Sequence, residues 1–104
     1  MDEAESSYRR AAAAAPNDLQ IRFNVGRMLI ARGQFTDAIA ELDPLKSVEH
    51  PDRPRFLFGL ATAHVLAGHR EEGQRYAIQA RDLARERGQR DLADSIDREL
   101  AKLK

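Results

Sequence analysis

The sequence predicts an all-α protein of about six helices joined by short loops. Its apolar residues recur at spacings of three and four, which places them on one face of a helix. No stretch of useful length alternates between apolar and polar residues, and β-branched residues are scarce, so no strand is expected. Turn-forming residues divide the chain into segments of helical length, at Pro16, Gly33, Pro51 with Pro54, Gly68 and Gly88.

The expected helices follow one another from the N-terminus, each with one apolar face. In order, these faces carry Ala4, Tyr8, Ala11 and Ala15; Ile21, Val25, Met28 and Leu29; Ala38, Leu42 and Leu45; Leu57, Leu60, Ala61 and His64; Tyr76, Ala77, Ala80 and Leu83; and Leu92, Ile96, Leu100 and Leu103. Pro44 interrupts the third helix. Because proline lacks a backbone N–H, we expect a kink or an early end near Asp43.

Length and composition describe one globular domain. Of the 104 residues, 42% are hydrophobic and 33% charged, with a formal net charge of +0. That balance gives no support to a nucleic-acid partner or a membrane surface, and the absence of cysteine excludes disulfides. The opening MDEAESSYRR lacks the apolar core of a signal peptide, so the compartment stays open, with the cytoplasm as the default expectation. The arginine- and alanine-rich composition favours a bacterial source.

A pattern of 34 to 35 residues repeats along the chain. Five positions recur 35 residues later: Phe23, Val25, Gly26, Ile30 and Gly33 become Phe58, Leu60, Ala61, Val65 and Gly68. Three others recur on both sides: Ala38, Leu42 and Leu45 match Gly73, Ala77 and Ala80, and also Ala4, Tyr8 and Ala11. A helix pair recurring at this period is typical of a solenoid.

These residues resemble the tetratricopeptide repeat (TPR) family. Each unit of this family consists of two helices with a motif on each. The motif of the first helix occurs twice here, as Arg22, Val25, Gly26 and Leu29 and as Leu57, Leu60, Ala61 and His64. The motif of the second helix occurs three times, as Ala4, Tyr8, Ala11 and Pro16, as Ala38, Leu42, Leu45 and His50, and as Gly73, Ala77 and Ala80. Arg22 and Ala77 depart from the motif, which has a large apolar residue and an aromatic residue there. The resemblance implies a right-handed superhelix of antiparallel helix pairs over residues 1–104, with a half repeat at 2–16, repeats at 19–52 and 54–87, and a capping helix at 89–103.

The resemblance also explains the glycines. Gly26 and Ala61 would lie where two helices cross closely, with Ala38 and Gly73 opposite them. Gly33 and Gly68 would end helices in the left-handed conformation. The alternative for Gly26 is that it only weakens its helix.

No catalytic or metal-binding arrangement stands out, and we expect neither an enzyme nor a cofactor. His50 and His69 fall in predicted turns, and His64 fills a packing position. No histidine pair has the spacing of metal ligands on a helix. Glu71 and Glu72 open a helix, where acidic residues favour the helix dipole.

We therefore expect a protein-interaction module whose first helices line a concave groove. The candidate peptide-binding residues are Gln20, Phe23, Asn24, Arg27, Arg55, Phe58 and Thr62. The charged residues of 19–36 are all arginines (22, 27 and 32), as are those of 53–70 (53, 55 and 70), so an acidic or C-terminal-carboxylate peptide is the expected partner. The alternatives are that the arginines lie over apolar neighbours with their charges in water, and that Phe23 and Phe58 pack between helices.

Two other functions remain open. The half repeat at 2–16 could pair with a second copy, which would make the chain a self-assembling structural element. The chain could also be an auxiliary domain of a larger protein. The final segment, 89–103, is expected to present a polar outer face made by Arg90, Asp94, Asp97, Arg98 and Lys102.

Overall fold

The computed structural model describes residues 18–103, and within this range it contains only helices. They are α2 (Leu19–Ala31), α3 (Phe35–Leu42), the 3-10 helix η1 (Asp43–Ser47), α4 (Arg53–Leu66), α5 (Arg70–Glu86) and α6 (Arg90–Lys102). The all-α prediction is confirmed for this part of the chain. The half repeat predicted at 2–16, and any pairing through it, lies outside the described residues.

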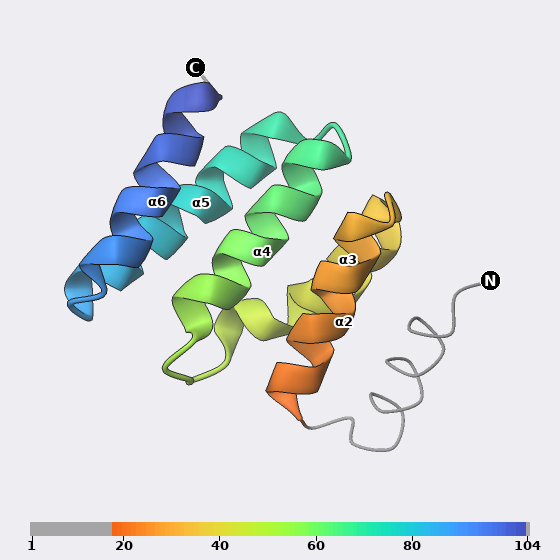
Figure 1. The fold of residues 1–104 in the computed structure, drawn as a ribbon, viewed down its shortest axis with the longest axis horizontal. Helices are drawn as coiled ribbons and strands as arrows, with labels where there is room; N and C mark the ends of the chain where they lie inside the picture. Colours follow the sequence, from red (N-terminus) through yellow and green to blue (C-terminus); the bar gives the residue numbers. More distant parts are fainter. Residues whose placement is uncertain (1–17, 104) are drawn as a thin grey trace.

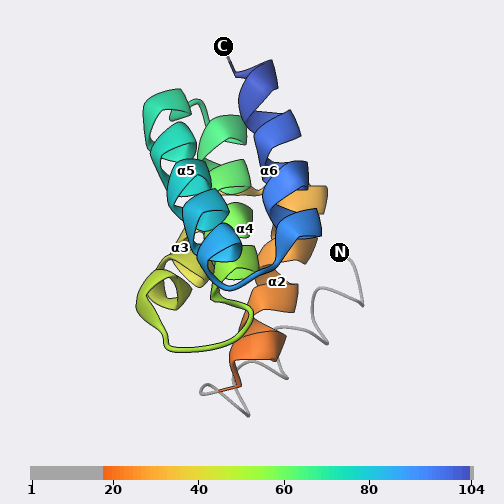
Figure 2. The same cartoon turned by 90° about the vertical axis from the view of Figure 1, so that its left-hand side faces the viewer.

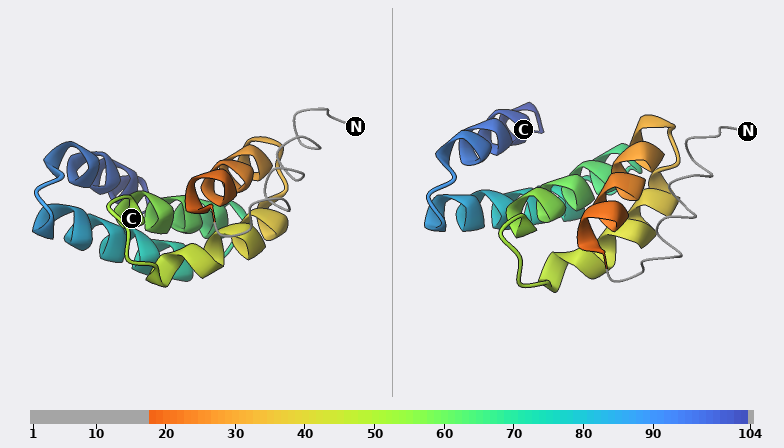
Figure 3. Two further views of the ribbon diagram at one scale, coloured as in Figure 1. Left: turned by 90° about the horizontal axis from the view of Figure 1, so that it is seen from below. Right: turned by 60° about the horizontal axis from the view of Figure 1, so that its bottom comes forward.

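Helix α4 lies at the centre of the molecule (Figure 1). Helices α2 and α6 flank it on one side, and α3 and α5 cover the other side (Figure 2). Seen from below, α2 and α6 lie toward opposite ends of the molecule, on the same side of α4 (Figure 3). The shortest dimension, 19 Å, corresponds to two helix layers spaced by roughly 8–10 Å.

Two hydrophobic clusters fill the space between these layers, and α4 contributes to both because it is buried on opposite faces. The first joins α2, α3, η1 and α4 through Phe23, Val25, Leu29, Ala38, Leu42, Leu45, Phe56, Leu60 and Ala63. The second joins α4, α5 and α6 through Leu57, Ala61, Ala77, Ala80, Ile96 and Leu100. Most positions predicted to be apolar faces therefore lie in the core.

The helix ends predicted at Gly33 and Gly68 and the interruption predicted near Pro44 are confirmed. Gly33 and Gly68 have φ values of +77° and +94°, in the left-handed region that side chains disfavour. Helix α3 ends at Leu42, and the chain continues as the short 3-10 helix that contains Pro44. Leu45 in that turn stays buried, so the interruption preserves the apolar face.

The close helix crossing is confirmed at Gly73 but differs at Gly26. A Cβ atom on Gly73 would lie 2.8 Å from the backbone oxygen of Ala61, so α4 and α5 approach with their backbones there. A Cβ atom on Gly26 would instead overlap the side chain of Leu42. Gly26 is buried, as predicted, but a large side chain from α3 occupies the space that its missing side chain leaves.

Helix α6 buries Ala93, Ile96 and Leu100 against the preceding helices. Asp97, predicted on its outer face, instead faces α5 and accepts a hydrogen bond from Arg81 at 3.2 Å. The prediction was wrong for this residue because long arginine side chains of α5 reach across to it.

Candidate binding groove

The face of the molecule shared by α2, α4 and α6 holds an open hollow of about 460 Å³, which we call the central groove. Its lining consists of Phe23, Arg27, Ile30, Arg55, Phe58, Gly59, Thr62, Leu92 and Ser95. Five of the seven candidate binding residues are among them. The spacing of residues on two separate helices therefore predicted a surface that the fold does assemble.

The floor of the groove is aromatic. Phe23 is only 8% exposed and packs against Phe56, with ring centroids 5.1 Å apart. Gly59 provides room for that ring, because a Cβ atom there would lie 2.9 Å from Phe23 Cε1. Phe58 is half-buried and packs against the second cluster. Both phenylalanines thus pack between helices, as the alternative interpretation expected, while each also presents part of its ring to the groove.

Two arginines supply the charge of the central groove. Arg27 on α2 and Arg55 on α4 are exposed, and neither forms an ion pair with any residue of 18–103. The Arg27 guanidinium lies over the Phe23 ring, 5.8 Å from its centroid. Stacking on an aromatic face leaves the N–H donors of a guanidinium free for a ligand.

The other arginines of 19–36 and 53–70 do not line the central groove. Arg22 pairs with Glu41 at 3.4 Å, and Arg53 donates to the Lys46 backbone oxygen at 2.9 Å. Arg70 donates to the backbone oxygen of Leu103 at 2.6 Å. Arg32 does not line the groove. The broad basic face expected from the sequence is therefore reduced to two side chains.

Gln20 and Asn24 do not line the central groove. Gln20 is exposed and Asn24 half-buried, and they precede Arg27 on α2 by about 10 Å and 5 Å along the helix axis. The hollow begins at Phe23 on α2, so Gln20 lies before it, whereas Asn24 is turned away from it by about 100° around the helix from Phe23.

Helix α6 contributes two lining residues that sequence reasoning missed, Leu92 and Ser95. Residues 89–103 were interpreted only as a cap. The repeat itself could have predicted Leu92 as a lining residue, because Leu92 follows Phe58 by 34 residues and thus continues the repeat period.

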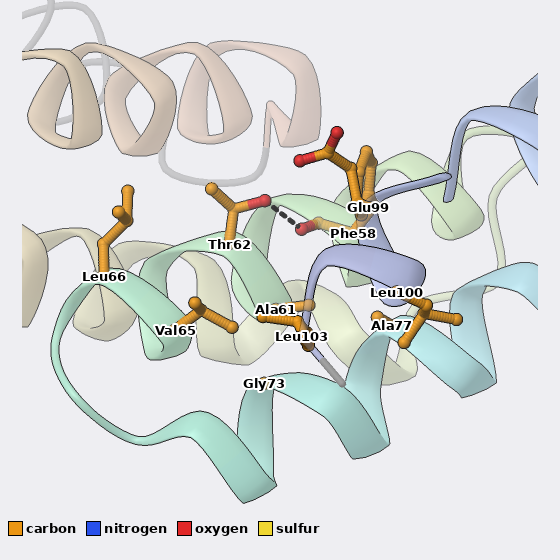
Figure 4. Close-up of a pocket in the computed structure, with 10 residues that line it drawn as sticks. All are labelled: Phe58, Ala61, Thr62, Val65, Leu66, Gly73, Ala77, Glu99, Leu100 and Leu103. Carbon is orange, nitrogen blue, oxygen red and sulfur yellow. Dashed lines mark hydrogen bonds between the residues drawn. The ribbon is translucent and has the colours of Figure 1, made fainter. Parts of the chain in front are cut away.

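The central groove continues into a smaller hollow at each end. Toward the C-terminal end of α4 lies a slot of about 130 Å³, lined by Phe58, Ala61, Thr62, Val65, Leu66, Gly73, Ala77, Glu99, Leu100 and Leu103 (Figure 4). Toward the α5–α6 turn lies a polar hollow of about 400 Å³, lined by Pro51, Asp52, Arg55, Gly88, Gln89, Arg90, Asp91 and Leu92. Shared lining residues make the three hollows one continuous surface.

A histidine pair lies on the opposite side of α4. His64 is buried, its ring stacks on Tyr76 at 5.4 Å, and its Nδ1 lies 3.1 Å from Nδ1 of His69. Burial lowers the pKa of His64, and the nearby Glu72 carboxylate opposes that shift. One nitrogen must donate and the other accept, so the contact requires at least one neutral ring. Across residues 18–103, no group of three or more histidine, cysteine or acidic side chains is arranged to hold a metal ion.

No family model matches the chain, and no curated protein matches it in sequence. Its fold is similar to the solution structure of a protein from Bordetella parapertussis that was determined as a target of the Northeast Structural Genomics Consortium. The TM-score is 0.81 at 17% identity, and the alignment covers 99% of this chain and 89% of that one. At this identity the likeness concerns the fold. Among the described helices, none is long and apolar enough to cross a membrane.

Proposed function

We propose that the chain is a tetratricopeptide-repeat-like module, without enzymatic activity, that binds an acidic segment of a partner protein in the central groove. The observation that carries this proposal is the pair of exposed arginines, Arg27 and Arg55, beside an apolar floor and without ion-pair partners among the described residues. Protein interfaces typically combine an apolar centre with arginine side chains.

The repeat spacing supports the family assignment. Ala61 and Gly73 face each other at the crossing of α4 and α5, and Gly33 and Gly68 end the helices that precede each turn. The layers that place α2, α4 and α6 along one curved face are compatible with a right-handed superhelix of antiparallel helix pairs (Figure 3). In such a superhelix this is the concave face.

The charge of the groove favours a carboxylate ligand. A guanidinium can donate two parallel hydrogen bonds to one carboxylate, and such pairs are stronger than neutral hydrogen bonds. Aspartate, glutamate or a terminal carboxylate meets that requirement, and the apolar floor around Phe58 would bury neighbouring side chains of the same segment.

The test uses a display library of random linear peptides selected on the wild-type protein. The affinity of an enriched peptide is then measured by fluorescence anisotropy for wild type, Arg27→Glu, Arg55→Glu and the control Arg75→Glu. Arg75 is exposed on α5 and lines none of the three hollows.

Each groove variant should weaken binding at least about tenfold, because the reversed charge repels the acidic residue of the peptide. The control should change affinity less than about twofold, within the small effect of a distant surface charge. If no acidic peptide is enriched, or if the control variant weakens binding as much as the groove variants, the proposed function is wrong.

A further inference from the structure

We infer that the slot between α4, α5 and α6 is a specificity subsite that receives one aliphatic side chain of the bound segment, next to the acidic residue held by Arg55. The inference deepens the proposed function and rests on it.

The slot is a preformed apolar space. Its inner wall is made of small buried residues, Ala61, Gly73 and Ala77, and it is closed toward α6 by Leu100 and Leu103 (Figure 4). Leu66 stands at its edge with 49% of its surface exposed. At about 130 Å³, the slot has room for a single aliphatic side chain and none for a helix.

The polar atoms at the slot already have partners. The Thr62 hydroxyl donates to the Phe58 backbone oxygen at 3.0 Å, and Glu99 at the edge pairs with Lys102 at 2.9 Å. A ligand acceptor would lose its water there without gaining a free donor, whereas an aliphatic side chain has no hydrogen bond to lose. The Glu99 carboxylate also repels an acidic residue, so the acid belongs at the other end, near Arg55.

That other end carries mixed charge. Asp52, Arg90 and Asp91 line the polar hollow together with Arg55, whereas Arg27 and Arg55 are the charged residues of the central groove. A ligand carboxylate therefore gains most on the groove side of Arg55, between the two arginines and away from both aspartates.

The spacing between the two features constrains the ligand. Arg55 precedes Thr62 by seven residues on α4, which is about 10 Å along the axis. An extended segment covers that distance in about three residues. The fitting ligand is thus an extended segment with an aliphatic residue three positions from an aspartate or glutamate.

The packing of the α2–α3 pair shows how a variant of the α4–α5 pair can fill the slot with its own side chain. At the equivalent position 35 residues earlier, Leu42 occupies the space beside Gly26. The double variant Ala61→Gly with Ala77→Leu reproduces that arrangement in α4 and α5 and fills the slot with its own leucine. Thr62→Phe, at a half-buried position, blocks the slot from the groove side if the double variant folds poorly.

The experiment measures how strongly each protein depends on the aliphatic residue of an enriched peptide. Fluorescence anisotropy compares the peptide with its alanine-substituted form on wild type, on both slot variants and on Ile78→Phe, a control on α5 that lines no hollow. We expect alanine to weaken binding about tenfold on wild type and on the control, and less than about twofold on the slot variants.

The inference is overturned if the alanine form loses the same factor on wild type and on the slot variants, or if enriched peptides lack the three-residue spacing. A spacing of seven would indicate a helical ligand and would also overturn it. Peptides that still depend on Arg27 and Arg55 would leave the proposed function standing in these cases. If no enriched peptide depends on those arginines, both proposals are wrong.

Discussion

The α2–α3 pair and the α4–α5 pair follow the same 35-residue spacing, but the smallest residue at the helix crossing lies on the first helix in one pair and on the second helix in the other. Where α2 has Gly26 and α3 has Ala38, α4 has Ala61 and α5 has Gly73, so the smaller residue changes sides. A large side chain, Leu42, then fills the first pair, whereas Ala77 at the equivalent position leaves the slot empty in the second. The same residue spacing is thus packed by different side chains in the two pairs, and the smaller residue at position 77 leaves the slot that we propose as a subsite.

The largest expected effect is at Leu42, which makes the first pair differ from the second. Leu42→Ala gives the first pair the residue that the second already has, and it removes a fully buried side chain. We expect the free energy of unfolding to fall by about 3 kcal/mol, since such truncations leave a cavity. Urea denaturation followed by circular dichroism measures the change. A loss below about 1 kcal/mol would mean that the first cluster closes over the gap and that the comparison is mistaken.

A smaller effect is expected when the second pair receives the first pair's residue. Gly73→Ala places a methyl group 2.8 Å from the Ala61 backbone oxygen, which cannot move without shifting α4. Because the crowded atom belongs to the backbone, we expect a crowding cost at the upper end of the usual range, about 2–3 kcal/mol. After the gain of roughly 1 kcal/mol in helix propensity, the net destabilisation in urea denaturation should be about 1–2 kcal/mol.

The matched control for that variant is Gly59→Ala, also within a helix. Its added methyl group meets the edge of the Phe23 ring rather than a backbone atom. A small shift of that ring toward the groove accommodates it, and the gain of roughly 1 kcal/mol in helix propensity offsets the cost of the shift. Gly59→Ala should therefore be close to neutral. Equal destabilisation by both variants would attribute the effect to glycine in general and remove the case for a close backbone crossing.

The sequence predicted those parts of the fold that depend on local rules. Helical periodicity located the buried faces, and the left-handed preference of glycine located the turns at Gly33 and Gly68. It did not predict that Leu42 fills the space beside Gly26, because that choice depends on side-chain directions in three dimensions. For the same reason it counted Arg22, which pairs with Glu41, among the groove charges. A flexible arginine can reach several partners, and its helix position does not decide among them.

The groove shows the same limit. Phe23, Arg27, Arg55, Phe58 and Thr62 were predicted because they share helix faces that the repeat brings together. Leu92 and Ser95 were missed since they belong to a helix interpreted as a cap. Gln20 was included because its helix face continues beyond the hollow, and Asn24 was included although it is turned about 100° around α2 from Phe23. Periodicity gives the direction of a side chain around a helix, whereas the length of a groove depends on how neighbouring helices cross.

The last difference between the pairs concerns charge. Leu29 is fully buried in α2, and the equivalent residue in α4 is His64. The His64 ring faces His69 and Glu72 and stacks on Tyr76. Asp43 and Lys46 are the other charged residues nearby. Because burial lowers its pKa in the folded protein, the unfolded chain takes up a proton first as the pH falls through its ordinary value of 6.5. Stability is thus complete above that value and declines below it, until the folded protein also takes up the proton.

His64→Leu makes the second pair match the first and should flatten this decline. Urea denaturation between roughly pH 8 and pH 5 measures it, as the difference in slope between wild type and variant. His50→Gln serves as the control for the removal of a histidine, because His50 lies in the loop before α4 and its ring contacts Phe56 of the first cluster. Parallel pH profiles for wild type and His64→Leu would show that the buried ring is protonated as easily in the folded chain as in the unfolded one. His64 would then be a packing residue equivalent to Leu29. The α2–α3 and α4–α5 pairs would differ only in which side chains fill the space where their helices cross.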